Sequence, residues 1–236
     1  MALNRRAVLL WFLLDLLIST RASADEPNKP IRGRVLFDGK IPKAKVIDES
    51  GRNRDLIEVD PKTSGLRFAA VFLLDAPMSE APDRLEELRI DQKDFTFVPR
   101  IVTVRAGQAV KFTNSDSANH NVRGASLLPK NEFNVYTGTQ GESIHRFVAD
   151  PKNRPIRLGC DIHAWMTGWI YVFDHPYYAV TDSEGRFELR GVPPGKHRVA
   201  IRQPDVGFAR ELEVMVTKSA VASIEIRFRE GDLRLN

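Results

Sequence analysis

Short runs in which apolar and polar residues alternate recur along the chain, a pattern typical of β-strands with one buried face. They lie between turn residues such as Asp, Gly and Pro, at 31–40 (a strand that ends in an Asp-Gly turn), 101–105, 109–114, 144–148, 156–159, 169–173, 196–202, 211–217 and 223–228. The run from Phe68 to Leu74 is almost continuously apolar and has the length of a strand, which predicts a buried strand. The pattern therefore predicts an all-β protein, with room in 236 residues for one large or two small domains.

The first residues have a different pattern, that of a secretory signal peptide. An arginine pair precedes an apolar run from 7 to 18, and the small residues at 22–24 supply a cleavage site. The alternative, a membrane anchor, fits less well because the run is too short to span a bilayer and Asp15 interrupts it. We expect residues 1–24 to be removed, which would leave a periplasmic or secreted protein with no stable membrane span. Both the general secretory and the twin-arginine routes stay open.

Charge and cysteine content narrow the function. The whole chain carries +4, and removal of the leader, with its three arginines and one aspartate, leaves +2. So balanced a charge gives no reason to expect nucleic acid or an anionic membrane as a partner. A single cysteine cannot form an internal disulfide. It is left as a buried thiol, an intermolecular bridge, a nucleophile or a metal ligand.

The neighbours of that cysteine favour a metal ligand. Cys160 is followed by His163 and Met166, and a thiolate, an imidazole and a thioether together suit copper better than magnesium or calcium. A blue-copper site needs a second histidine, and the best candidate is His120, which follows the strand predicted at 109–114. Structural zinc usually takes four Cys or His ligands, and a Cys–His nucleophilic pair would lack an orienting motif. Without its neighbours, Cys160 would be interpreted as a buried inert thiol, and Met166 would be interpreted as a residue that fills the core.

The Cys-x2-His-x2-Met spacing, with a histidine forty residues upstream, resembles the type 1 copper site of the cupredoxins and is most similar to that of amicyanin. The strand, glycine turn and strand at 95–114 are similar to the cupredoxin pattern that leads to the first histidine, so the resemblance covers residues 88–175. It implies a Greek-key β-sandwich that binds one type 1 copper ion through His120, Cys160, His163 and Met166. It also implies that Asn121 ties the strand of the first ligand to the cysteine loop.

The end of the chain resembles a different module. Thr-Asp-x-x-Gly-x-Phe from Thr181 and Gly-Val-Pro-Pro-Gly from Gly191 are similar to the carboxypeptidase regulatory-like, or transthyretin-like, β-sandwich. That module opens with further strands, which residues 30–76 supply. We therefore expect one sandwich split between 30–76 and 176–230, with the copper domain inserted, because 30–76 alone is too small to bury a core. The alternative is three consecutive units, with 30–76 packed on the copper domain.

These features together predict an exported type 1 copper protein that carries single electrons and is not an enzyme. Its redox partner would be a cytochrome or an oxidoreductase, and the resemblance implies that the edge of His163 reaches the surface through an apolar patch. Trp165 would shield the metal from water or form part of the docking surface. We interpret the separately placed His145, His175 and His197 as structural or surface residues. The rival function is a copper-handling or carbohydrate- or envelope-binding module without an electron-shuttle role.

Overall fold

The computed structural model of the chain describes residues 29–47, 53–76 and 85–235, and the predicted signal peptide at 1–24 lies outside them. Strands make up nearly all the regular structure of these residues, so the prediction of an all-β protein is confirmed. Two short 3-10 helices accompany them, η1 (Pro129–Asn131) and η2 (Glu230–Asp232). In the described residues no helix is long and apolar enough to cross a membrane.

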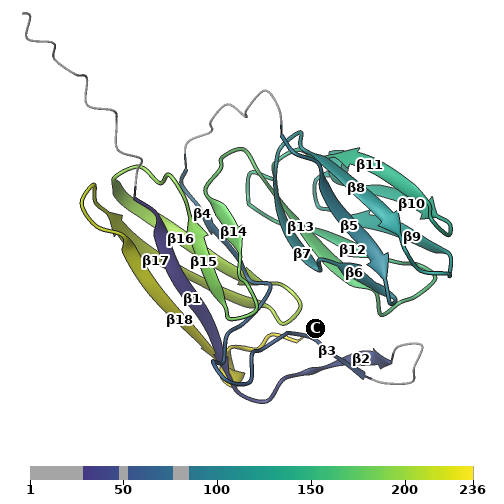
Figure 1. Cartoon of the computed structure of the whole chain (residues 1–236), viewed down its shortest axis with the longest axis horizontal. Coiled ribbons are helices and arrows are strands. Elements are labelled where there is room, and N and C mark those ends of the chain that lie inside the picture. The colour runs from purple at the N-terminus through teal and green to yellow at the C-terminus, as the bar shows by residue number, and fades with distance from the viewer. Residues whose placement is uncertain (1–28, 48–52, 77–84, 236) are drawn as a thin grey trace, which may run out of the picture.

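Two β-sandwiches lie side by side (Figure 1). The first, called here the terminal sandwich, has sheets with the strand orders β15-β1-β18 and β14-β4-β16-β17. Its strands are β1 (Ile31–Asp38), β4 (Ala70–Leu73), β14 (Tyr178–Val180), β15 (Arg186–Leu189), β16 (Gly195–Gln203), β17 (Phe208–Val216) and β18 (Ala222–Arg229). β1 runs antiparallel to β15 and parallel to β18, so an N-terminal strand lies between two strands from the C-terminal part of the chain.

Strand pairing in the terminal sandwich joins residues on either side of the middle of the sequence. β4 hydrogen-bonds with β14 and β16, which lie more than a hundred residues later. Val35, Val71 and Phe208 belong to one buried cluster, so both parts of the chain contribute to the same core. The domain boundaries at 30–76 and 176–230 and the resemblance to a transthyretin-like module stay predictions.

The turn predicted between 182 and 185 is present, but it has a role that the pattern did not indicate. The N–H of Gly185 donates to the carbonyl oxygen of Asp182 at 3.0 Å, yet β14 before the turn and β15 after it lie in different sheets. Thr181 fixes the crossing, because its buried hydroxyl accepts a hydrogen bond from the N–H of Ala69 (2.8 Å) and donates one to the carbonyl of Leu66 (2.7 Å). These bonds hold the end of β14 beside β4 and turn the chain toward the opposite sheet.

The second, or central, sandwich is continuous in sequence and contains the candidate copper ligands. Its sheets have the orders β10-β9-β12-β13-β7 and β11-β8-β5-β6. The strands are β5 (Leu88–Lys93), β6 (Thr96–Val98), β7 (Ile101–Arg105), β8 (Ala109–Asn114), β9 (His120–Ala125), β10 (Phe133–Thr137), β11 (Glu142–Arg146), β12 (Ile156–Gly159) and β13 (Thr167–Phe173). β7, β8 and β12 have the predicted bounds, whereas β5 and β9 were not expected. Their buried positions include the polar residues Gln92, His120 and Asn121, which hide the alternation.

A third apolar cluster, called here the junction cluster, joins the two sandwiches. Its buried members are at most 2% exposed and come from both bodies: Ala70, Phe72 and Ala200 from the terminal sandwich, and Ile101, Tyr171 and Phe173 from the central one. The Phe72 ring lies 4.7 Å from that of Phe173 and 5.7 Å from that of Tyr171. β4 therefore has its second face covered as well, since Val71 and Leu73 belong to the terminal core. This double burial explains the continuous apolar run from Phe68 to Leu74.

A hairpin called here the arm leaves the terminal sandwich between β1 and β4. It consists of β2 (Lys43–Ile47) and β3 (Asn53–Asp55), which among the described strands pair with each other, and Figure 1 shows it projecting along the central sandwich. Residues 41–66 have a weak pattern, so the sequence did not predict these strands. Arg54 of the arm donates hydrogen bonds to the carbonyl oxygens of Phe95 (2.9 Å) and Asp94 (3.1 Å) in the central sandwich.

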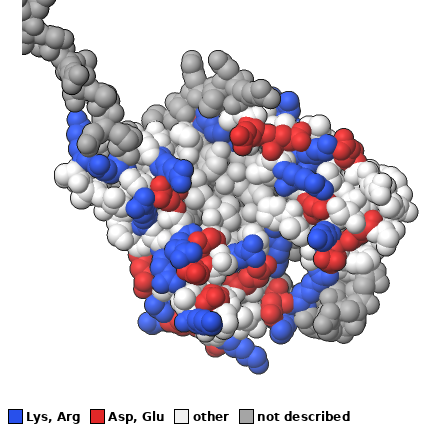
Figure 2. All heavy atoms as spheres, viewed as in Figure 1, with Lys and Arg blue, Asp and Glu red and all other residues white. Residues whose placement is uncertain are grey.

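Charged side chains of both signs are interspersed over the described part of the face in Figure 2. Many form exposed pairs, such as Arg198 with Asp75 and Arg227 with Asp38. A mixed surface of this kind produces no strong field of one sign over that face.

Candidate metal centre

Three side chains with metal-binding atoms meet inside the central sandwich: His120, Cys160 and His163. The sulfur of Cys160 lies 3.8 Å from Nδ1 of His120 and 3.7 Å from Nδ1 of His163. The two Nδ1 atoms are 2.9 Å apart. All three residues are buried, with at most 8% exposed. The structure therefore brings together three of the four ligands that the sequence predicts.

The sheet places these residues together. His120 is the first residue of β9 and Cys160 directly follows β12, and the two strands are antiparallel neighbours. In such a pair the start of one strand lies near the end of the other, so a residue forty positions away is brought beside the cysteine. His163 comes from the loop after Cys160, where the N–H of Met166 donates to the carbonyl of His163 at 3.0 Å.

Met166, the fourth predicted ligand, is 1% exposed and belongs to the same buried cluster as Cys160. The two residues also line one cavity of about 320 Å³, whose wall includes Arg123 and Arg157. The buried apolar neighbourhood of Met166 suits a thioether. The role of Met166 as an axial ligand stays a prediction.

Asn121 connects β9 with the cysteine loop. Its side-chain oxygen accepts hydrogen bonds from the N–H of Asp161 (2.7 Å) and from the thiol of Cys160 (3.3 Å). Its amide nitrogen donates to the Asp161 carboxylate at 2.9 Å. Hydrogen bonds from Asn134 above all, and then from Asn121 and Arg123, hold the pKa of Asp161 below its ordinary value. The ionised carboxylate thus keeps the amide of Asn121 oriented beside the sulfur.

Asp116 is a partner of the cluster that the sequence did not reveal. Its Oδ2 lies 2.9 Å from Nε2 of His120. A carboxylate oxygen that faces Nε2 favours the tautomer with the proton on that nitrogen, in which Nδ1 presents its lone pair to the cluster. The same carboxylate accepts hydrogen bonds from the N–H groups of Asp94 (2.7 Å) and Phe95 (3.0 Å). The available signal was a carboxylate four residues before a predicted ligand histidine.

Aromatic rings cover the histidine side of the cluster. The ring of Phe95 lies edge-on to those of His120 and His163, with centroids 5.5 and 5.0 Å apart. Trp165 lies 5.3 Å from His163 and 6.4 Å from Phe95. These contacts favour the shielding role for Trp165. They also leave His163 only 8% exposed, so at most a narrow edge of its ring reaches the surface. The neighbouring Ile162 is 53% exposed and provides apolar surface beside it.

The donor atoms fit a single metal ion. Ligand nitrogens and sulfurs lie about 2.0–2.3 Å from a bound transition metal, and separations of 2.9 to 3.8 Å between donors agree with such distances around one centre. The described residues form no other group of three or more metal-binding His, Cys, Asp or Glu side chains. His145, His175 and His197 lie outside the group, in contacts with Phe133, Phe173 and the carbonyl of Pro193.

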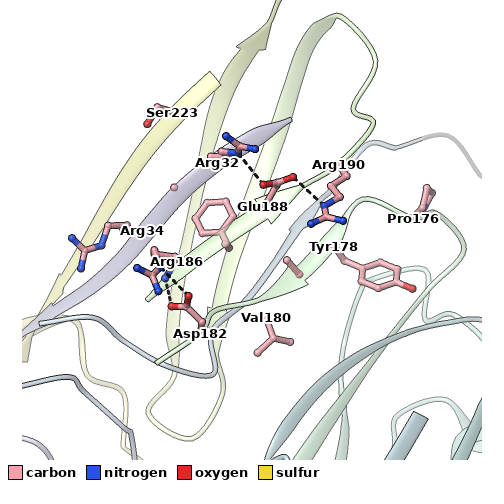
Figure 3. A pocket seen from close by; sticks show the side chains of 13 residues that line it. Arg32, Arg34, Pro176, Tyr178, Val180, Asp182, Arg186, Glu188, Arg190 and Ser223 are labelled. Atoms are coloured by element: carbon pink, nitrogen blue, oxygen red, sulfur yellow. Dashed lines mark hydrogen bonds and ion pairs between the residues drawn. The ribbon is translucent and has the colours of Figure 1, made fainter. Parts of the chain in front are cut away.

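A separate cavity of about 810 Å³ lies on the terminal sandwich (Figure 3). Four arginines line it: Arg32, Arg34, Arg186 and Arg190. The carboxylates in its wall are Asp182, which accepts from Arg186 at 3.0 Å, and Glu188, which Arg32 and Arg190 share at 2.8 and 3.0 Å. Because Arg34 and Arg186 are direct cross-strand partners, the sheet places like charges opposite each other, which normally reduces stability. The wall has four guanidinium groups and two carboxylates, and Glu184, next to the cavity, also pairs with Arg186.

Comparison with known proteins finds similarity at the level of structure. No protein-family model and no curated protein matches the chain. The Cu-containing nitrite reductase from Thermus scotoductus SA-01 is 20% identical over 42% of this chain, with a TM-score of 0.34, and the match spans only 26% of that enzyme. A purple cupredoxin from Nitrosopumilus maritimus is 20% identical over 36% of this chain and 99% of its own, with a TM-score of 0.31. A reduced mutant of amicyanin is 16% identical over 37% of this chain and 82% of its own, at 0.33. Likeness at these scores carries no conclusion about function.

Proposed function

We propose that the chain is an exported type 1 copper protein that carries single electrons between redox partners. The observation that supports this most is the buried meeting of His120, Cys160 and His163, whose ligand atoms lie within 4.8 Å of one another. Two imidazoles and one thiolate are the in-plane donors of blue-copper electron-transfer sites. The group contains no carboxylate, the ligand that calcium and magnesium prefer.

The two histidines would bind copper through Nδ1 and Cys160 through its sulfur, with Met166 as a weak axial ligand. Bound copper would supply the one-electron chemistry. Asp116 holds the proton on Nε2 of His120 and so keeps Nδ1 free to bind a cation. Phe95 and Trp165 exclude water from the histidine side. Three ligands on one short loop and His120 on a neighbouring strand would make a site that moves little on a change of charge, which favours rapid electron transfer.

The partner that we propose is a cytochrome or an oxidoreductase in the periplasm or an equivalent compartment. Ile162, exposed beside His163, would be apolar surface for docking. The predicted ligands leave no open metal position of the kind that a catalytic site keeps for substrate. For this reason we propose an electron carrier and not an enzyme.

Addition of Cu(II) to the purified chain tests the proposal. An intense visible charge-transfer band that bleaches on reduction is the expected result, because a copper–thiolate bond produces it. A pale spectrum would reject the type 1 site and favour the rival, a module that handles copper without carrying electrons. Zn(II) provides a colourless control for binding without a redox change.

The arginine-lined cavity favours a second candidate function, recognition of an acidic carbohydrate of the cell envelope by the terminal sandwich. Guanidinium groups bind carboxylate and sulfate in a forked geometry, and the described wall holds four of them against two carboxylates. The test is retention on immobilised heparin in a salt gradient. Arg32→Ala with Arg34→Ala should elute at clearly lower salt, while Arg198→Ala, on the opposite sheet and paired with Asp75, should elute like the parent. Elution of the parent, the double variant and Arg198→Ala at the same salt concentration would reject this candidate function.

A further inference from the structure

The two-residue turn between β5 and β6 has an unusual backbone. Lys93 and Thr96 pair across the hairpin, so Asp94 and Phe95 form the whole loop. Both have positive φ angles, 51° and 56°. A tight hairpin turn of this hand favours Asn-Gly, because most side chains disfavour the left-handed region. Phenylalanine is therefore held here against its own preference, and strained positions of this kind are often functional.

Two charged side chains hold the turn from opposite sides. The Asp116 carboxylate accepts the N–H groups of both turn residues. The Arg54 guanidinium donates to both of their carbonyl oxygens. All four polar backbone groups of Asp94 and Phe95 are thus occupied by hydrogen bonds to ionised partners, which are stronger than neutral ones. Removal of either partner frees the backbone to leave the left-handed region.

We propose that Arg54 is a positioning residue through which the terminal sandwich controls the metal centre. Arg54 belongs to the arm, whereas the turn that it holds carries the Phe95 ring onto His120 and His163. The turn also shares Asp116 with His120, so a displaced turn changes the partner of the ligand histidine as well. The effect on copper rests on the proposed function, but the effect on the turn does not.

A second contact keeps the arm in place. Arg100, which precedes β7, donates to the carbonyl of Asp55 at 3.4 Å and pairs with the Asp205 carboxylate of the terminal sandwich at 3.1 Å. Both groups of this ion pair are largely buried, with 18% and 4% of the side chains exposed. The arm therefore lies against the central sandwich at two points, and Arg54 is the one that reaches the metal centre.

The first test uses the metal-free protein and amide hydrogen exchange. In Arg54→Ala the amides of Asp94 and Phe95 should exchange at least about tenfold faster, because the turn opens locally. Arg54→Lys should give a smaller increase, since one ammonium group cannot match the fork of a guanidinium. Lys43→Ala is the matched control: it removes a cation from the same arm, but its partner is Asp55 and it does not contact the turn. Unchanged exchange in Arg54→Ala, or an equal increase in Lys43→Ala, would overturn the proposal.

The second test loads the protein with Cu(II) and measures the reduction potential and the charge-transfer band. Arg54→Ala should shift both. Phe95→Asn accepts the left-handed backbone but lacks the ring, so adding Arg54→Ala to it should produce little further shift. An equal shift in both backgrounds would mean that Arg54 does not act through Phe95, which overturns the inference. Failure to bind copper would reject the proposed function instead, and the exchange experiment would still decide the role of Arg54.

Discussion

The Nδ1 atoms of His120 and His163 lie 2.9 Å apart, although the residues are 43 positions apart in the sequence. Two nitrogen lone pairs at this distance repel unless a proton or a cation lies between them. His120 already has its proton on Nε2, where Asp116 accepts it. The metal-free protein can therefore keep the Nδ1 proton of His163 between the two nitrogens, and a bound cation would replace that proton, with the sulfur of Cys160 as a third donor.

Cys160→Ser should abolish the visible charge-transfer band of the copper-loaded protein and preserve the fold. Serine has nearly the same shape but cannot form the copper–thiolate bond that produces the colour. Visible absorption and far-ultraviolet circular dichroism measure the two effects. His197→Gln, which alters a histidine outside the cluster, should keep the band. A coloured Cys160→Ser protein would contradict the ligand assignment.

Met166→Leu should keep the colour and raise the reduction potential. The two side chains have similar volume, so the change at this buried position should cost less than about 1.5 kcal/mol of stability. Loss of the weak axial thioether leaves a less electron-rich copper, which favours Cu(I). Voltammetry of parent and variant gives the difference, and a large fall in potential would argue against a thioether ligand.

Asp116→Ala should weaken copper binding by about 10- to 100-fold, the usual effect of removing a partner that orients a ligand histidine. Both tautomers of His120 become available, and the N–H groups of Asp94 and Phe95 lose their acceptor. Competition with a chromophoric chelator measures the affinity. Asp60→Ala is a suitable control, because Asp60 makes its hydrogen bonds in a turn of the terminal sandwich. Equal affinities for all three proteins would show that Asp116 has no role.

Phe72→Ala should destabilise the protein by about 3–5 kcal/mol, the cost of deleting a large buried ring. Its ring contacts both Tyr171 and Phe173 of the other sandwich, so the loss also weakens the junction cluster. Chemical denaturation followed by tryptophan fluorescence measures the change. The exposed Leu127→Ala should change stability by less than about 0.5 kcal/mol. A comparable effect at both positions would contradict the importance of the junction.

His175 should make the junction sensitive to acid. Burial lowers the pKa of this histidine, and the nearby Asp174 and Arg105 act in opposite directions. The unfolded chain therefore binds the proton first, near pH 6.5. The contribution of neutral His175 to stability is complete above that pH and is lost as the pH falls through the lower folded pKa. Unfolding free energies of the parent between pH 7.5 and 5 should fall more steeply than those of His175→Asn, and parallel curves would refute the assignment.

The alternation of residues was sufficient to predict the fold class and many strands, because it reports the local environment of each side chain. It failed where buried residues are polar for a tertiary reason. β9 begins with His120 and Asn121, which contact the sulfur of Cys160, and β5 buries Gln92, whose amide donates to Thr137 at 2.8 Å. Such residues are indistinguishable in sequence from those of a loop.

The site was predictable to the extent that its chemistry depends on residue type and spacing. Cys160, His163 and Met166 share one loop, and His120 was the histidine that followed an apolar strand. Asp116 and Arg54 could not be found in this way, because their roles arise from contacts with the backbone of Asp94 and Phe95. A side chain that donates to or accepts from the backbone of a distant turn does not alter the apolar–polar pattern of its own segment.

The central sandwich is attached to the rest of the molecule by its two ends, and the junction cluster lies beside both attachments, with β4 before the first and β13 before the second. A rotation of the central sandwich against the terminal one would therefore have to separate Phe72 from Phe173. As long as this contact holds, anything bound to the terminal sandwich keeps its spacing from His163. In the proposed electron carrier, a redox partner held by the terminal sandwich would therefore meet the candidate copper site at one distance, and the rate of electron tunnelling falls steeply with distance.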